Sequence, residues 1–215
     1  MRDLMTHRPG FEETIKNLIA TDPKKLMPLR EALARWIPER MFAPGEVPAY
    51  SNYGAALAGY IVQRVSGEPF EAYVERHIFQ PLRMDHSTFR QPLPKSLEAD
   101  MSKGYDKASG DPKPYELISM SPAGALAATG DDMARFMLAH LNNGSYAGAQ
   151  ILKPETARTM HGRVYPVPDG TLAMGLGFYH EDRNGYDIVG HGGDTVYFHS
   201  DLHLILDKGV GFYVT

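Results

Sequence analysis

The sequence predicts an α+β fold, in which a helical region is followed by strands of an antiparallel sheet. Between Thr6 and Met160, apolar residues recur at three- and four-residue spacing, which is typical of helices with one buried face. After Gly175 the spacing changes to strict alternation, which is typical of strands. With 43% hydrophobic and 22% charged residues, the chain can build a core. We therefore expect a mostly helical part over residues 1–165 and a part made of strands over residues 166–215.

The clearest predicted helix covers residues 53–65, where apolar residues share one face and Gly67 closes the run. Ser51 or Asn52 is placed to cap its first amides. Asp22 before Pro23 suits a helix start. Shorter helices are predicted over residues 11–20, 26–36, 70–78 (ended by Pro81), 131–141 (capped by Asp131) and 153–160. Proline and glycine make residues 41–49 irregular, and we expect residues 90–122 to be a long loop with one or two short strands.

Apolar residues alternate from Val196 to Leu206, which predicts a strand with one buried face. The segment Asp207-Lys208-Gly209 predicts a turn, after which Val210 resumes the alternation. Two strands are marginal without others, and we find too few further strands in residues 1–186. The sheet is therefore expected to be incomplete, with an unpaired edge through which chains can associate.

Composition and charge exclude several classes of function. The chain has 22 Lys and Arg against 26 Asp and Glu, so no nucleic-acid partner is expected. Its longest apolar stretch, residues 55–62, is far shorter than the ~20 residues that span a bilayer. The N-terminus lacks the apolar core of a signal peptide, which leaves localisation open. The absence of cysteine excludes disulfides, thiol catalysis and cysteine-ligated metals, and we expect no cofactor.

Two short segments contain residues suited to chemistry. Tyr50 and Asn52 lie on the loop that leads into the predicted helix, and His191-Gly192-Gly193-Asp194 lies just before the predicted strand. Taken alone, each pattern is weak, because such a tyrosine is more often a packing residue and such a glycine pair more often a turn.

Other histidines have a structural interpretation. His199 and His203 share a strand face with Asp201, but residues four apart on a strand are separated by ~13 Å and cannot share a metal. We expect a solvated face and no metal site there. His7 is expected to fix a loop by hydrogen bonding.

Five segments occur in an order that resembles the serine β-lactamase-like hydrolases, which include class C β-lactamases, D-alanyl-D-alanine peptidases and family VIII-type esterases. They are LMTHRPGF (4–11), FAPG with YSNYG (42–45 and 50–54), SPAGAL with TGDDMARF (121–126 and 129–136), GLGF (175–178) and GHGG (190–193). Arg8-Pro9 replaces the usual pair of the first segment, and His191 stands where other members have lysine. The resemblance implies a β-lactamase/transpeptidase-like fold.

The resemblance also implies a mechanism through an acyl-enzyme. Tyr50 would take the proton of a serine nucleophile, Asn52 would orient the base and hold the substrate, and His191 would line the pocket. Gly192 and Gly193 would let the substrate approach, and the Asp194 N–H would form half of an oxyanion hole. A neutral imidazole in place of lysine favours an ester or peptide over a β-lactam.

The nucleophile of this family is the serine of a Ser-x-x-Lys motif, and none of the ten serines here has lysine three positions later. We therefore expect the chain to be an internal piece of a longer serine hydrolase, inactive alone and acting on an ester, amide or β-lactam substrate when complete. The alternatives are a pseudoenzyme that binds peptides or acyl compounds, and a site completed by a serine from a second chain. A periplasmic or secreted location is compatible with the resemblance.

Overall fold

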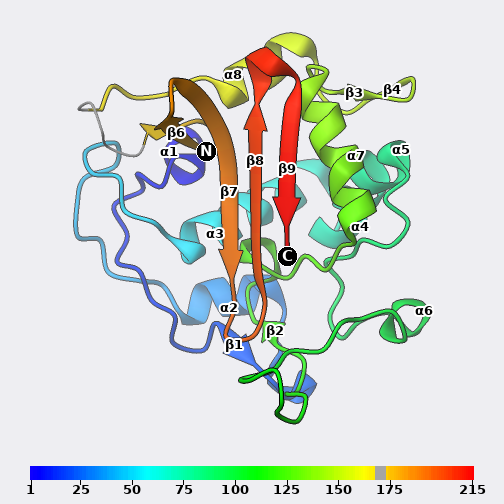
Figure 1. Ribbon diagram of the computed structural model, residues 1–215. Coiled ribbons are helices and arrows are strands. Elements are labelled where there is room, and N and C mark those ends of the chain that lie inside the picture. The colour runs from blue at the N-terminus through cyan, green and yellow to red at the C-terminus, as the bar shows by residue number, and fades with distance from the viewer. Residues whose placement is uncertain (168–172) are drawn as a thin grey trace.

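The computed structural model describes residues 1–167 and 173–215 and shows helices packed behind an antiparallel sheet (Figure 1). The five-stranded sheet has the order β5-β6-β7-β8-β9. Its strands are β5 (Ala173–Met174), β6 (Tyr179–Arg183), β7 (Tyr186–Asp194), β8 (His199–Ile205) and β9 (Val210–Val214). Residues 168–172, which fall in the part predicted to be strands, lie outside the described residues. The α+β prediction is confirmed.

The prediction of too few strands before residue 187 was wrong, because β5 and β6 precede it and β7 begins at Tyr186. A tight turn at Asn184 and Gly185 joins β6 to β7, with φ angles of 51° and 79°. Asn-Gly is the dipeptide that two-residue hairpins favour, since both central residues need positive φ. This turn signal was in the sequence and went unused.

The register of β8 sets which side chains face the helices. Leu202 and Leu204 are buried, and they pair with Tyr213 and Gly211 of β9. The apolar residues of β9 therefore lie on the opposite face and are about half exposed: Val210, Phe212 and Val214. The strand begins at His199, later than predicted, because the preceding residues form a turn in which the Thr195 N–H donates to the Phe198 carbonyl.

The prediction for the central helix is confirmed. Helix α3 covers Asn52–Ser66, and the Ser51 hydroxyl accepts a hydrogen bond from the Gly54 N–H at 3.0 Å. Gly67 ends the helix in the left-handed conformation. Its buried face packs with α2 (Leu29–Arg35) and with β2 (Leu117–Ile118), which pairs with β1 (Ile19–Ala20) in a small second sheet.

The predicted helix over residues 11–20 was wrong, because this segment is a loop that ends in β1. Asn17 has a positive φ of 62°, and Leu18 is buried while Ile15 is 75% exposed. Tertiary contacts of this loop outweigh its apolar spacing.

Other helix boundaries differ for local reasons. Helix α2 begins after Pro28, and a separate 3-10 turn η1 (Pro23–Lys25) follows Asp22, whose side chain caps it. The segment α4 (Phe70–Val74) continues through a π-helix η2 (Glu75–Phe79) into α5 (Gln80–Leu82), so Pro81 does not end it. The remaining helical segments are α1 (Arg2–Met5), α6 (Lys95–Glu98), η3 (Ser121–Ala123), α8 (Pro154–His161) and η4 (Leu206–Lys208).

Helix α7 (Gly130–Leu141) packs its apolar side on the inner face of the sheet (Figure 1). The prediction that Asp131 caps this helix was wrong. The Thr129 side chain caps it by accepting a hydrogen bond from the Asp132 N–H, and the Asp132 side chain is fully buried. A two-stranded hairpin of β3 (Ser145–Tyr146) and β4 (Ala149–Gln150) follows α7.

Three buried histidines lie where α7, α8 and β6 meet. His140 and His161 share a hydrogen bond of 2.9 Å between Nδ1 and Nε2, and both rings contact Phe178 edge-on. His180 is buried beside Asp187, with 2.9 Å between Nδ1 and Oδ1. Burial lowers the pKa of His140 to about 4, and the neighbouring His161 contributes. Burial also lowers the pKa of His161, so His140 and His161 connect the helices to the sheet in their neutral form.

Among the described residues, no helix is both long and apolar enough to cross a membrane. Within the same residues, β9 pairs with β8 alone and so ends the sheet. Association through this edge stays a prediction.

Candidate active site

Tyr50 lies on the loop that enters α3, and His7 holds this loop in place. The Ser51 N–H donates to His7 Nδ1 at 3.1 Å, and the His7 ring lies 4.2 Å from the Tyr50 ring between centroids. The prediction that His7 fixes a loop is confirmed. Because His7 Nδ1 accepts a hydrogen bond, the neutral ring carries its proton on Nε2.

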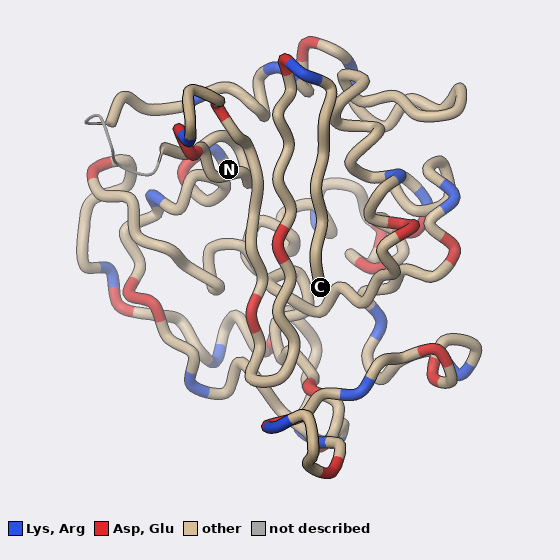
Figure 2. The backbone as a smooth tube through the Cα atoms, viewed as in Figure 1, with Lys and Arg blue, Asp and Glu red and all other residues tan. Residues whose placement is uncertain are grey.

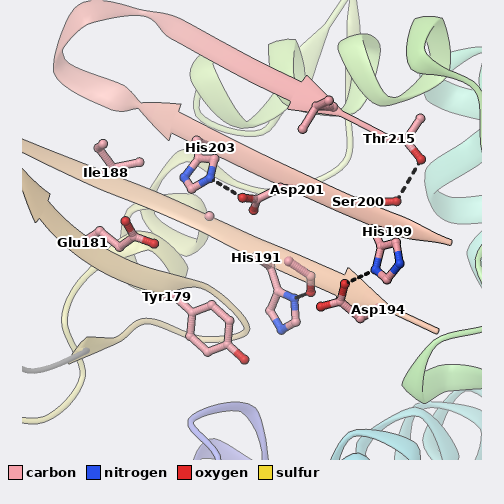
Figure 3. Close-up of a pocket in the computed structure, with 13 residues that line it drawn as sticks. Tyr179, Glu181, Ile188, His191, Asp194, His199, Ser200, Asp201, His203 and Thr215 are labelled. Atoms are coloured by element: carbon pink, nitrogen blue, oxygen red, sulfur yellow. Dashed lines mark hydrogen bonds and ion pairs between the residues drawn. The ribbon is translucent and has the colours of Figure 1, made fainter. Parts of the chain in front are cut away.

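The structure brings Tyr50 together with His191, with 6.3 Å between ring centroids. His191, Gly192 and Gly193 lie within β7, so this segment is part of the sheet and not the turn that a glycine pair alone more often forms. Tyr179, the first residue of β6, stacks on the His191 ring at 4.6 Å with an interplanar angle of 19° (Figure 3). Tyr179, His191 and Asp194 contribute to the lining of a pocket of about 530 Å³.

Burial lowers the pKa of His191, although its hydrogen bond to the Gly192 carbonyl and the charge of Asp201 act in the opposite direction. Nδ1 makes that hydrogen bond, so a neutral His191 donates from Nδ1 and keeps the lone pair on Nε2. This tautomer leaves Nε2 able to accept a proton or a hydrogen bond.

The ring cluster of His7, Tyr50, His191 and Tyr179 is uncharged at neutral pH. Burial and the nearby His191 lower the pKa of His7 to about 4. Burial raises the pKa of Tyr50, and the negative charge of Glu13 raises it further. Burial and the nearby Tyr50 raise the pKa of Tyr179. Tyr50 is therefore a neutral phenol that needs a neighbouring cation before it can act as a base.

Asn52 is engaged by a residue that the sequence did not single out. The Asn52 backbone N–H donates to Glu13 Oε2 at 2.8 Å, and its side-chain Nδ2 donates to Glu13 Oε1 at 2.9 Å. One of the two Nδ2–H donors of Asn52 is thus engaged, and its second N–H and its Oδ1 can meet a substrate.

At the end of β7, the backbone N–H and C=O groups on one side of the strand are not paired with β6. Strand β6 begins at Tyr179, opposite Gly190, whereas His191–Asp194 pair with β8 only within the described residues. Gly192 and Gly193 lie in this segment, and on the free side its polar groups can bind another extended chain. A role for the Asp194 N–H in an oxyanion hole stays a prediction.

A buried carboxylate fixes the turn that follows β7. Glu116 Oε2 accepts from the Thr195 hydroxyl at 2.5 Å and from the Tyr197 N–H at 2.9 Å, and Oε1 accepts from the Val196 N–H at 3.0 Å. Glu116 is only 5% exposed, so these contacts hold the turn against the loop that precedes β2.

The two histidines of β8, His199 and His203, each lie beside a carboxylate on the solvent-facing side of the sheet. His203 lies 2.8 Å from Asp201, and His199 lies 2.6 Å from Asp194 (Figure 3). Each pair is partly or fully exposed at the surface.

The sequence interpretation missed Glu13, Tyr179 and Glu116. Tyr179 directly follows the GLGF segment, which was a usable signal. Glu13 lay in a wrongly predicted helix, and Glu116 contacts residues about 80 positions away along the chain, so neither had a local signal.

A helical region that packs on an antiparallel sheet, with a tyrosine before α3 facing a strand histidine, defines the β-lactamase/transpeptidase-like fold class. The chain belongs to the β-lactamase family, since the family model described as "Beta-lactamase" matches residues 1–215. The resemblance seen in the sequence is confirmed.

Known proteins resemble this chain in sequence or in fold over most of its length. A β-lactamase of Yersinia enterocolitica is 27% identical over 177 residues, covering 82% of this chain and 43% of its own length. An octameric penicillin-binding protein homologue from Pyrococcus abyssi superposes with a TM-score of 0.77 at 24% identity, covering 98% of this chain and 50% of that protein. D-amino acid amidase from Ochrobactrum anthropi SV3 superposes with a TM-score of 0.78 at 22% identity, covering 99% of this chain and 62% of that protein. The chain spans under half the length of the Yersinia relative.

Proposed function

We propose that this chain supplies the Tyr50–His191 half of the active site of a serine hydrolase that cleaves esters or amides through an acyl-enzyme. The observation that carries the proposal is the 6.3 Å approach of the Tyr50 and His191 rings, where the start of α3 meets the end of β7. Membership of the β-lactamase family supports hydrolysis as the reaction.

In the proposed reaction, Tyr50 takes the proton of the attacking serine and returns it to the leaving group. Its raised pKa in this chain requires a neighbouring ammonium to favour the phenolate, a role suited to the lysine of a Ser-x-x-Lys motif. His191 Nε2 would accept a hydrogen bond from Tyr50 or from the substrate. The Asp194 N–H would stabilise the oxyanion together with the N–H of the nucleophilic serine.

An ester or amide substrate is favoured over a β-lactam, because no cation of the ring cluster is available to bind a carboxylate. Both His7 and His191 have lowered pKa values and are neutral near pH 7. D-amino acid amidase, one of the structural neighbours, was crystallised with L-phenylalanine amide, which contains an amide bond of the class proposed here.

Incubation with p-nitrophenyl butyrate and with nitrocefin tests whether any serine of this chain acts as a nucleophile. We expect no turnover and no acyl adduct on any serine by intact-mass spectrometry. Burst acylation of any serine would contradict the proposal.

Ligand binding tests the site itself. A neutral acyl amide, 3-phenylpropanamide, should shift the NMR signals of the His191 and Tyr50 rings. Shifts confined to another surface would exclude this site.

A catalytically inactive binding module of the same fold is the second candidate. The absence of a Ser-x-x-Lys motif from these 215 residues favours it. It predicts a stable monomer with measurable ligand affinity, whereas association of chains through β9 predicts a concentration-dependent mass in gel filtration.

A further inference from the structure

Glu116 is a buried carboxylate that contacts the turn directly after Asp194, the residue with the proposed oxyanion donor. Its Oε2 accepts hydrogen bonds from the Thr195 hydroxyl and the Tyr197 N–H, and its Oε1 accepts from the Val196 N–H. The hairpin of β7 and β8 itself has no lysine or arginine (Figure 2). The donors of this one turn therefore stabilise the buried carboxylate, and they can all reach it in only one conformation of the turn.

The Asp194 N–H points away from β8. The next residue, Thr195, donates its own N–H to the Phe198 carbonyl across the hairpin at 2.9 Å. Successive residues of an extended strand direct their N–H groups to opposite sides, so the Asp194 N–H faces the side on which β6 begins only at Tyr179, opposite Gly190. On that side the N–H is open to a substrate carbonyl. Its direction depends on how the following turn is held.

The segment that carries Glu116 is fixed at its base. Ile118, two residues further along, pairs with Ile19 of β1. The Gln91 side chain donates to the Ile118 carbonyl at 2.8 Å and accepts from the Ile118 N–H at 2.6 Å. A side chain can position its neighbours accurately only when its own backbone is rigid. The small second sheet thus supports the end of β7 through Glu116 (Figure 1).

Apolar packing also covers this turn, but it does not fix peptide orientation. The Tyr115 and Phe198 rings meet edge-on with 6.1 Å between centroids, and a Cβ added at Gly104 would lie 2.5 Å from the Cβ of Tyr197. Such contacts are non-directional, whereas hydrogen bonds depend on the direction of each N–H. Glu116 is therefore the group that sets the backbone geometry of the turn.

We propose that Glu116 is a positioning residue of the active site, which holds the Asp194 N–H in the direction of the substrate carbonyl oxygen. It acts through the turn that begins at Thr195, and not by contact with the substrate. A donor that is already oriented stabilises an oxyanion without reorganising during the reaction. This inference rests on the proposed function, because it concerns the oxyanion donor of the same site.

Two neutral ligands that differ at the carbonyl test the inference on the chain as it is. 3-Phenylpropanamide offers a carbonyl oxygen to the Asp194 N–H, and 3-phenylpropan-1-ol has no carbonyl. Binding is measured by NMR titration of the Asp194 amide and the Tyr50 ring. We expect Glu116→Gln to bind the amide about fivefold more weakly, with a smaller ligand-induced shift of the Asp194 amide proton, and to bind the alcohol as wild type does.

The substitution Glu116→Gln keeps the size of the side chain and replaces one acceptor oxygen by an NH₂ donor, so one N–H of the turn loses its partner. Glu98→Gln is the matched control, because Glu98 is an exposed glutamate on a groove that Tyr115 also lines, and it should keep both wild-type affinities. Thr195→Val removes the hydroxyl and should have the same selective effect as Glu116→Gln, whereas Thr195→Ser keeps the hydroxyl and should restore binding.

A measurement without ligand separates positioning from stability. In ¹⁵N relaxation, the order parameters of residues 194–197 should fall from a rigid value of about 0.85 towards about 0.6 in Glu116→Gln. Urea unfolding of the same variants gives their stability. A purely structural role would lower the unfolding free energy, weaken both ligands equally and leave the order parameter of Asp194 unchanged.

Equal weakening of both ligands in Glu116→Gln would overturn the positioning role and leave the proposed function standing. Wild-type order at Asp194 in that variant would also overturn it. If Glu116→Gln does not fold, the Thr195 pair decides by the same criteria. Absence of binding of both ligands to wild type would contradict the proposed function, and the role of Glu116 with it.

Discussion

Lowering the pH is expected to destabilise the protein through the buried His140. This side chain is 3% exposed, and burial together with His161 lowers its pKa from 6.5 to about 4. In the unfolded chain the imidazole is protonated below pH 6.5, so between pH 6.5 and 4 unfolding takes up a proton. The stability from neutral His140 is complete above about pH 6.5 and is lost as the pH falls towards 4. The loss amounts to about 3 kcal/mol.

Urea unfolding followed by circular dichroism at pH 7, 6, 5 and 4 measures this loss. His140→Gln removes the titrating group, so it should be less stable at pH 7 but should lose less stability on acidification. We expect the slope of unfolding free energy against pH to fall by about 1.4 kcal/mol per pH unit in this range. His86→Gln, at an exposed position, is the control and should keep the wild-type slope. An unchanged slope in His140→Gln would refute the assignment.

Three further perturbations test other parts of the structure. Asp132 is fully buried and accepts hydrogen bonds from His86, Ser87 and Arg135, so Asp132→Ala should lower the unfolding free energy by about 3 kcal/mol in urea melts; a loss under 1 kcal/mol would contradict this. Gly10 has a φ of 78°, and an added Cβ would overlap the Phe42 carbonyl, so Gly10→Ala should cost at least about 2 kcal/mol in the same assay, and a neutral effect would be unexpected. In a ¹³C NMR titration of labelled tyrosine, Tyr50 should remain mostly protonated at pH 10, since burial and Glu13 raise its pKa; Glu13→Gln should lower that pKa, and an unshifted phenol would argue against the charge contact.

Local signals in the sequence were sufficient for the elements that depend on neighbours along the chain. Ser51, the apolar spacing and Gly67 predicted α3, because caps and helix periodicity act within a few residues. The same local rule at Asn184 and Gly185 would have found the β6–β7 hairpin.

Errors arose where distant contacts outweigh local preference. The loop over residues 11–20 has the apolar spacing of a helix. Its conformation instead depends on the strand pairing of Ile19 with Ile118 and on the hydrogen bond from the Asn52 N–H to Glu13. Pro81 was expected to end a helix, yet the π-helical turn before it carries the chain through to Leu82.

By itself, the sequence determined the family resemblance and the identity of Tyr50, Asn52 and His191 as candidates, since the order of short motifs is a property of the chain. Only the tertiary structure decided that the two rings meet, that Tyr179 stacks on His191, and that Glu13 accepts hydrogen bonds from Asn52. Those relations depend on how strands and helices pack, and no local spacing encodes the distance between residues so far apart.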